Sequence, residues 1–328
     1  MLRDTFGRQI DYLRLAVTDK CNLRCNYCMP AEGIKWLKRA DLLSYEEMLR
    51  VVSVLASQGL RKVRITGGEP FLRKDLIHFL DSLTQIPGIE KVNITTNGTL
   101  TTKYLDDLWR MGIRSLNLSI DSLDAQRFAE ITRRDVFDQV WDCYRTMLDK
   151  GFKVKLNMVV MAKQNVQDIL PMLRLTEKDP VDVRFIEEMP FNGQEAAAAQ
   201  VWNYNQILDH IRTEYTAFDA LPLPPNSTAL NYQVPGHTGS FGVIPAYSRT
   251  LCGTCNRLRM TPQGMIKTCL YDEGVFNLRD FLRAGATDEQ LLEAIRSAIH
   301  HKAKNGFIAE ARRKNLPNIS ESMATIGG

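Results

Sequence analysis

The sequence predicts an α/β fold built on a parallel sheet, arranged as an incomplete (β/α)6 barrel similar to part of a TIM barrel. Between residues 10 and 190, six short β-branched segments alternate with helical patterns, and such alternation is typical of parallel strands joined by right-handed crossovers. We expect strands at residues 11–17, 62–66, 91–95, 115–120, 153–160 and 181–186. We expect helices at residues 44–57, 73–84, 101–111, 137–150 and 167–175, the first with a capping box from Ser44 to Glu47.

A doubly wound sheet would show the same alternation, so the charges within the strands decide between the two architectures. Strands that are buried on both faces normally read as apolar runs. Here charged and amide side chains interrupt the strands, often at alternate positions: Arg14, Lys62, Arg64, Asn93, Asn117, Lys155 and Arg184. Cations are costly in a dry core but reasonable in an open lumen that holds an anionic ligand. We therefore expect the partial barrel.

The composition is that of an ordinary soluble globular protein. The 328 residues are 44% hydrophobic and 24% charged, with a net charge of +4. A positive excess of this size fits a phosphorylated small molecule or weak nucleic-acid contact, and it does not choose between them. The first fifteen residues carry charges throughout, and no stretch reaches the roughly 18 apolar residues of a membrane span. We therefore expect a cytoplasmic protein.

The chain is expected to divide into a partial barrel at residues 1–220 and a C-terminal region at residues 221–328. Residues 219–250 are rich in Pro, Gly, Ser and Asn, which is typical of a connector with extended segments. A hairpin is predicted at residues 257–269, with its turn at Pro262 and Gly264, followed by a helix at about residues 288–304. We expect this region to close the barrel and to end in a flexible tail.

Seven cysteines are the strongest indicators of function, and six of them form two groups of three. The first group, Cys21, Cys25 and Cys28, directly follows the first predicted strand. Three thiolates in one loop can hold three corners of a [4Fe–4S] cluster and leave the fourth iron open to another molecule, whereas electron carriers use four cysteines. Structural zinc is the alternative interpretation, although C-x3-C is an uncommon zinc half-site.

Cys252, Cys255 and Cys269 form the second group, for which zinc is a stronger alternative. C-x2-C is a usual zinc half-site, and His237 could complete a Cys3His set. Arg257 and Arg259 lie between these cysteines and would point to the same side of a strand.

The remaining features complete this interpretation. Arginine and lysine side chains suit a polyphosphate, and the chain lacks the G-x4-G-K-[ST] motif of a P-loop. Cys143 lies outside both groups, among apolar residues of a predicted helix, and we interpret it as a packing residue.

The first cysteine group, with Tyr27 before its last cysteine, resembles the radical S-adenosylmethionine (SAM) superfamily. The run Gly67-Gly68-Glu69-Pro70 after the second strand resembles a second element of that superfamily. The resemblance implies that the open iron chelates SAM and that reductive cleavage of SAM gives a 5′-deoxyadenosyl radical. It also implies a set of SAM-binding residues: Tyr27, Gly67, Gly68, Glu69, Thr95, Ser119, Asn157 and Met189.

Both cysteine groups, the Arg257/Arg259 pair and the terminal Gly327-Gly328 together are similar to the MoaA family, the GTP 3′,8-cyclases of molybdenum cofactor biosynthesis. The resemblance covers essentially the whole chain. It implies two [4Fe–4S] clusters, SAM as cofactor, and a lyase that converts GTP to (8S)-3′,8-cyclo-7,8-dihydroguanosine 5′-triphosphate after removal of H3′. The implied GTP contacts are Arg14, Lys62, Arg64, Lys155, Arg184, Arg257 and Arg259, and Gly327 and Gly328 would enter the active site as catalytic residues.

The same resemblance implies partners. These are the GTP substrate, an external electron donor and a downstream cyclic pyranopterin monophosphate synthase; a homodimer is allowed, and neither membrane nor nucleic acid is expected. Two alternatives remain: another radical SAM enzyme with an auxiliary cluster, such as a peptide-modifying one, and a zinc or iron–sulfur protein that binds RNA. The first gives no reason for Arg257, Arg259 or the Gly-Gly end.

Anaerobically purified protein is expected to contain about eight irons per chain, because each group of three cysteines would hold one [4Fe–4S] cluster. Iron and acid-labile sulfide analysis measures this content. Replacement of Cys255 by Ala should remove about half of the iron, whereas replacement of Cys143 should leave it unchanged. Stoichiometric zinc without labile sulfide would contradict both radical-enzyme interpretations.

Overall fold

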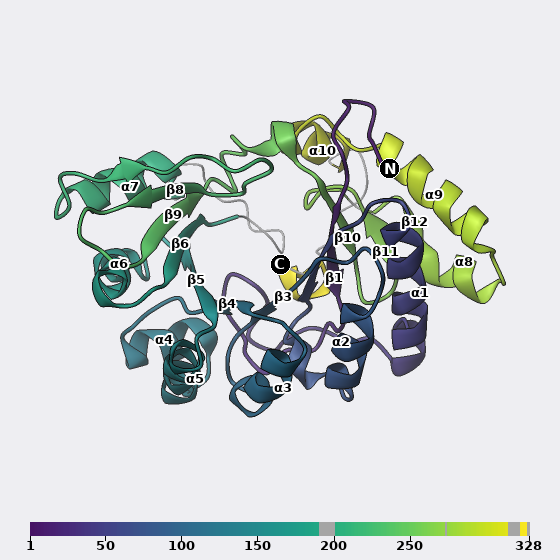
Figure 1. Ribbon diagram of the computed structural model, residues 1–328. Helices are drawn as coiled ribbons and strands as arrows, with labels where there is room; N and C mark the ends of the chain where they lie inside the picture. Colours follow the sequence, from purple (N-terminus) through teal and green to yellow (C-terminus); the bar gives the residue numbers. More distant parts are fainter. Residues whose placement is uncertain (190–200, 273, 314–321, 327–328) are drawn as a thin grey trace.

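The computed structural model describes residues 1–189, 201–272, 274–313 and 322–326 (Figure 1). Its centre is one sheet with the strand order β12-β11-β10-β1-β2-β3-β4-β5-β6-β9-β8-β7. The six central strands are parallel neighbours in chain order, which confirms the predicted partial barrel: β1 (Tyr12–Ala16), β2 (Lys62–Thr66), β3 (Lys91–Thr96), β4 (Ser115–Ser119), β5 (Lys153–Val160) and β6 (Asp182–Glu187).

Helices cover the outer side of this curved sheet, as Figure 1 shows. They are α1 (Tyr45–Ala56), α2 (Leu76–Thr84), α3 (Leu105–Arg110), α4 (Ala125–Thr132), α5 (Phe137–Asp149) and α6 (Ile169–Lys178). The capping box of α1 is confirmed, because Ser44 Oγ accepts a hydrogen bond from the Glu47 amide at 3.1 Å and Glu47 Oε2 accepts one from the Ser44 amide at 2.6 Å.

Several predicted helix limits are wrong. Residues 70–72 form a 3-10 turn, η2 (Pro70–Leu72), and α2 begins at Leu76 rather than at residue 73, after Asp75 in the left-handed conformation. Helix α3 begins later than expected because residues 102–104 form a second 3-10 turn, η3 (Thr102–Tyr104). Helix α4 was not predicted, although Asp124 caps its first turn by accepting a hydrogen bond from the Arg127 amide at 2.7 Å. Short helices carry little periodicity, and this one is stabilised by packing on α5.

The C-terminal half adds strands to both edges of the barrel sheet. Beside β1 lie β10 (Arg257–Met260), β11 (Met265–Lys267) and β12 (Phe276–Asn277), which include the predicted hairpin. Beside β6 lie β9 (Ser240–Ile244), β8 (Leu230–Gln233) and β7 (Asp219–Ala220), where we expected a connector with extended segments. The chain between β9 and β10 therefore passes from one edge of the sheet to the other. The boundary expected at residue 220 falls at the end of β7, which pairs with β8.

The C-terminal half also contains α7 (Tyr204–Arg212), α8 (Leu278–Arg283), α9 (Asp288–His300), α10 (Gly306–Arg313) and α11 (Met323–Ile326). Helix α7 was not predicted, although Asn203 and Gln206 form a reciprocal capping box at its start. Helix α9 ends at His300 rather than near residue 304, because the chain turns there and buries Lys302. Across the described ranges, no helix has both the length and the apolar character that a membrane crossing requires.

Alternate residues of the barrel strands face opposite sides of the sheet. The apolar positions, such as Leu13, Ile65 and Leu156, are fully buried beneath the helices, and Cys143 of α5 is 0% exposed among them, as predicted. The polar positions face the lumen in register, with Arg14 beside Arg64. This alternation confirms the reasoning that distinguished a barrel from a doubly wound sheet.

Candidate active site

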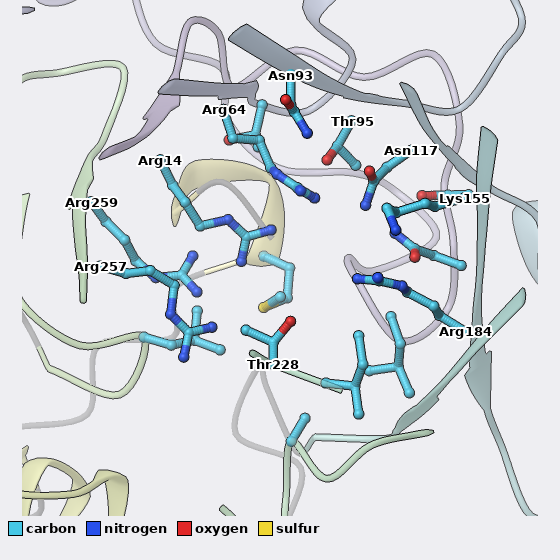
Figure 2. A pocket seen from close by; sticks show the side chains of 18 of the residues that line it. Arg14, Arg64, Asn93, Thr95, Asn117, Lys155, Arg184, Thr228, Arg257 and Arg259 are labelled. Atoms are coloured by element: carbon cyan, nitrogen blue, oxygen red, sulfur yellow. The ribbon is translucent and has the colours of Figure 1, made fainter. Parts of the chain in front are cut away.

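The lumen of the barrel is a single cavity of about 890 Å3 that both cysteine groups line. Figure 2 shows basic and amide side chains of the barrel strands and of β10 pointing into this space. A cavity of this size lies near the upper end of the range of about 300–1,000 Å3 that is usual for small-molecule sites. The sequence had placed the two cysteine groups more than two hundred residues apart, and the sheet brings them to one space.

The first cysteine loop leaves the end of β1 and is held by the glycine turn after β2. The amides of Gly68 and Glu69 donate hydrogen bonds to the carbonyls of Thr18 and Lys20 at 2.9 and 2.8 Å. A Cβ atom on Gly68 would lie 2.3 Å from the Lys20 carbonyl oxygen, and one on Gly67 would lie 2.5 Å from that of Thr18. Both glycines are therefore required because the backbone that leads into Cys21 passes directly against them.

Glu69 faces the protein rather than the cavity. Its buried carboxylate accepts hydrogen bonds from the Phe71 amide at 3.2 Å, from Thr96 Oγ1 at 2.9 Å and from the Asn97 amide at 2.7 Å. Burial raises the pKa of Glu69 to about 7, although these hydrogen bonds lower it. The side chain thus joins the glycine turn to the end of β3.

Tyr27 lines the cavity and is anchored by an acid that the sequence analysis did not single out. Its hydroxyl donates to Asp121 Oδ2 at 2.9 Å, while Asp121 Oδ1 accepts a hydrogen bond from the Val159 amide at 2.9 Å. Burial raises the pKa of Asp121 to about 6. The remaining expected SAM contacts also line the cavity, namely Gly67, Gly68, Thr95, Ser119, Asn157 and Met189.

The thiols of the first group suit metal ligation. Burial raises the pKa of Cys21 to about 11 and that of Cys28 to about 12, and it also raises the pKa of Cys25. Such thiols lose their protons at neutral pH only to a strong electrophile such as iron. Three soft donors that face one cavity therefore fit an iron–sulfur cluster with an open iron.

The second cysteine group lies on the segment between β9 and β10 that leads into β10, and just after the end of β11. Cys252 belongs to the turn η6 (Cys252–Thr254), and Cys255 Sγ accepts a hydrogen bond from Arg257 Nε at 3.4 Å. Burial would raise the pKa of Cys255, but the charges of Arg257 and Lys302 lower it to about 6. A stabilised thiolate of this kind is a good ligand for iron.

His237, considered as a fourth zinc ligand, does not belong to this group. Its Nδ1 lies 2.7 Å from Thr176 Oγ1, and its ring packs edge-on against Tyr215 at a centroid distance of 5.4 Å. It lies in the turn between β8 and β9, on the far side of the sheet order from β10. His237 therefore cannot complete a Cys3His zinc site with the second cysteine group.

Two cations that lie outside every motif hold the second cysteine group. Lys302 is buried, and its Nζ donates to the carbonyls of Arg257, at 3.0 Å, and of Thr268. Arg8 donates to the Cys252 carbonyl at 3.2 Å and to the Ala303 carbonyl at 2.8 Å. The N-terminal hairpin and the segment after α9 thereby fix all three backbone segments that carry the cysteines.

One arc of the lumen is crowded with cations around Tyr12. The strand register places Tyr12 beside Lys62 and Arg257, and Arg14 beside Arg64 and Arg259. Burial and, after it, the nearby charge of Arg257 lower the pKa of Arg259 to about 10. This mutual repulsion is relieved by an anion, so this arc suits a polyphosphate.

The opposite arc contains a carboxylate that the sequence analysis missed. Asp182 Oδ2 accepts from Lys155 Nζ at 2.5 Å and from Arg184 Nη2 at 2.7 Å. Asp182 therefore orients both cations and offsets part of their charge. The predicted GTP contacts thus divide into two sets. The more strongly positive set, compared with Lys155 and Arg184, consists of Arg14, Arg64, Arg257 and Arg259.

Gly327 and Gly328 lie outside the described residues. The short helix before them packs at the first cysteine loop, where Ser322 Oγ donates to the Cys28 carbonyl at 2.9 Å. Met323 and Ala324 line the cavity. The C-terminal segment that leads to the glycines is thus in contact with the candidate site.

Two family models match the chain: the Radical SAM superfamily over residues 15–176 and Molybdenum Cofactor Synthesis C over residues 181–308. The GTP 3′,8-cyclase of Clostridium perfringens (strain SM101 / Type A) is 40% identical, and the alignment covers 100% of both chains. The chain belongs to the GTP 3′,8-cyclase family of the radical SAM superfamily.

A longer relative and a solved structure are also similar to the chain. The molybdenum cofactor biosynthesis protein moc-5 of Caenorhabditis elegans is 44% identical over 97% of this chain and 53% of its own length. The chain thus spans about half the length of this relative. The crystal structure of Streptococcus suis SuiB bound to S-adenosylmethionine has a TM-score of 0.64 at 15% identity, covering 92% of this chain and 68% of that one. At this identity the likeness shows the fold alone.

Tyr12 is expected to ionise near pH 8 in this member of the GTP 3′,8-cyclase family. Burial would raise its pKa, but the charges of Arg64, Arg14 and Lys62 overcome burial and lower it to about 8. Ultraviolet difference titration should show one tyrosine step near that pH, and Tyr12→Phe should remove the step. Above this pH the phenolate should weaken binding of inorganic triphosphate to the wild type but not to the variant.

Tyr45→Phe is the matched control for this titration, because burial raises the pKa of Tyr45 and its side chain lies outside the cavity lining. A step near pH 8 that survives Tyr12→Phe would contradict the assignment.

Replacement of Lys302 by Met is expected to lower the free energy of unfolding of the apoprotein by about 2–4 kcal/mol, because two buried carbonyls lose their donor. Urea unfolding measures this change. The exposed side chain of Lys304 provides the control, and Lys304→Met should change stability by less than about 0.5 kcal/mol. Equal effects of the two substitutions would show that Lys302 does not hold the second cysteine group.

Proposed function

We propose that the chain converts GTP to (8S)-3′,8-cyclo-7,8-dihydroguanosine 5′-triphosphate, the first step of molybdenum cofactor biosynthesis, by removing H3′ of GTP with a 5′-deoxyadenosyl radical. The observation that carries this proposal is one cavity lined by two separate groups of three cysteines and by an arginine cluster. A radical transfer needs the two reacting atoms in one water-poor space, and a shared lumen supplies it.

The first cysteine group would hold one [4Fe–4S] cluster through Cys21, Cys25 and Cys28, and such a cluster supplies the electron that cleaves SAM. The chain's own residues orient the ligand. The Gly67-Gly68 turn fixes the backbone that leads into the loop. The Tyr27 ring is held in one position by Asp121. Thr95, Ser119, Asn157 and Met189 would complete the SAM pocket.

The second group would hold a second cluster through Cys252, Cys255 and Cys269, with an open position for the guanine base. The triphosphate would lie against the cationic arc, where Arg14, Arg64, Arg257 and Arg259 point into the cavity (Figure 2). Lys62 lines the same cavity. Guanidinium groups bind phosphate oxygens in pairs, so this arc offers several such contacts. On the opposite arc, Lys155 and Arg184 are held by Asp182 and would meet the same substrate.

The proposal also includes partners, an oligomeric state and a cellular location, for which the cavity supplies no direct observation. An external donor would supply the electrons, and a cyclic pyranopterin monophosphate synthase would take the product. A homodimer, a cytoplasmic location and the division at residue 220 remain parts of the proposal. Gly327 and Gly328 would enter the cavity beside the first cysteine loop, where residues without side chains fit a crowded site. A peptide substrate would leave the buried arginines without anionic partners.

Anaerobic incubation with dithionite, SAM and GTP is expected to give 5′-deoxyadenosine that depends on GTP, together with a cyclised purine nucleotide. Liquid chromatography with mass spectrometry detects both products. Cys255→Ala should keep reductive cleavage of SAM but lose cyclisation, because it leaves the first cysteine group intact. If GTP leaves 5′-deoxyadenosine formation unchanged and is recovered intact, the substrate assignment is wrong.

A further inference from the structure

Between the two cationic arcs the lumen wall carries a neutral strip, formed by Thr66 of β2, Asn93 and Thr95 of β3, and Asn117 of β4, which we call the polar strip. The side-chain oxygen of each of these residues is buried and accepts no hydrogen bond from any described part of the chain. Figure 2 shows Asn93, Thr95 and Asn117 pointing into the cavity between Arg64 and Lys155. All four residues line the cavity.

The two asparagines of the polar strip are as deeply buried as Thr66, and each carries an amide. Asn93 and Asn117 are each 2% exposed, yet neither amide oxygen has a partner among the described residues. Asn165, which serves the fold, shows the contrast: its amide donates to the carbonyls of Asp121 and Val159 at 2.8 Å each and accepts from the Met161 amide at 2.8 Å. Buried amides in native proteins are normally satisfied in this way, so the polar strip is built for a ligand.

The unpartnered oxygens of the polar strip require a ligand that donates hydrogen bonds, such as one that carries hydroxyl groups. An amide oxygen needs a donor, and a phosphate oxygen or an ionised triphosphate offers none. An amide can also donate to a hydroxyl through its nitrogen, so an asparagine meets a hydroxyl group whichever way its amide is turned. A pair of neighbouring hydroxyls flanked by a polyanion is the feature of a ribonucleoside triphosphate that a deoxyribonucleotide lacks.

The strand register places the polar strip beside cations that could bind the phosphates of the same ligand. Asn93 pairs with Arg64 of the cationic arc, and Asn117 pairs with Thr95 on one side and Lys155 on the other. A sugar on this strip would have phosphate-binding cations beside it. It would also share its cavity with both cysteine groups.

We propose that Asn93 and Asn117 bind the ribose hydroxyls of the nucleoside triphosphate and thereby select ribonucleotides over deoxyribonucleotides. This inference rests on the proposed function, because it assigns the sugar of the same substrate. The two asparagines are specificity-determining residues, and nothing in their role requires them to contact the transferred hydrogen.

Equilibrium binding to the anaerobically reconstituted protein tests this assignment with GTP, 2′-deoxyGTP and 3′-deoxyGTP. The wild type is expected to bind GTP about tenfold more tightly than at least one of the deoxynucleotides, since a buried partner would be left without its hydrogen bond. In Asn93→Leu and Asn117→Leu, the ratio for one deoxynucleotide should fall to near one. Because all three ligands carry the same triphosphate, the ratio cancels any general loss of phosphate affinity.

Two further variants separate recognition from structure. Asn93→Asp keeps the accepting oxygen and should keep the GTP preference, although the added charge weakens binding of all three nucleotides. Asn231→Leu is the control, because its amide oxygen also lacks a partner among the described residues but its side chain lies outside the cavity lining, and it should leave the ratios unchanged. The leucine variants at positions 93 and 117 should unfold at the same or a higher temperature than the wild type, because an unsatisfied oxygen is replaced by an apolar group of similar shape.

The outcomes are distinct. Unchanged ratios in both Asn93→Leu and Asn117→Leu, with GTP still bound, overturn this inference and leave the proposed function standing. An equal loss of the preference in Asn231→Leu also overturns it, because the effect would then not depend on residues of the lumen. Absence of GTP binding by the wild type overturns the proposed function and this inference together.

Discussion

The cost of burying cations is the constraint on which this structure depends. The inward face of the barrel sheet carries Arg14 and Arg64, and the neighbouring strand β10 adds Arg257 and Arg259. Desolvating guanidinium groups in a closed core without anionic partners costs a large free energy. The barrel is therefore incomplete, and its lumen remains a cavity of about 890 Å3 rather than a packed layer of side chains.

Acidic residues in the lumen determine how much of this positive charge is available to a ligand. Asp182 binds Lys155 and Arg184, and Asp121 is occupied by Tyr27 and a backbone amide. No comparable carboxylate pairs with Arg64 in the described structure. The lumen is consequently asymmetric, with a strongly positive arc near the second cysteine group, a partly balanced arc opposite, and neutral amides between them.

The two cysteine groups face one space because of pairings between distant parts of the chain. Strand β10 adds to the edge of the barrel beside β1 and brings Cys255 and Cys269 with it. Lys302 and Arg8 then bind backbone carbonyls of the segments that carry these cysteines. These two cations come from the region after α9 and from the N-terminal hairpin. The second group is therefore held by residues that no local motif contains.

The sequence by itself determined the barrel, the cysteine groups and the cations of the lumen. Alternation of apolar and charged residues is a local property, and the limits of β2 and β5 were predicted to the residue. Family membership followed from short motifs. Only the tertiary structure decided that Glu69 faces the protein rather than the cavity, that Asp182 pairs with two cations, and that Lys302 supports the second cysteine group. These facts depend on contacts between segments far apart in the chain, and on which buried polar atoms find a partner, and neither leaves a periodic pattern in the sequence.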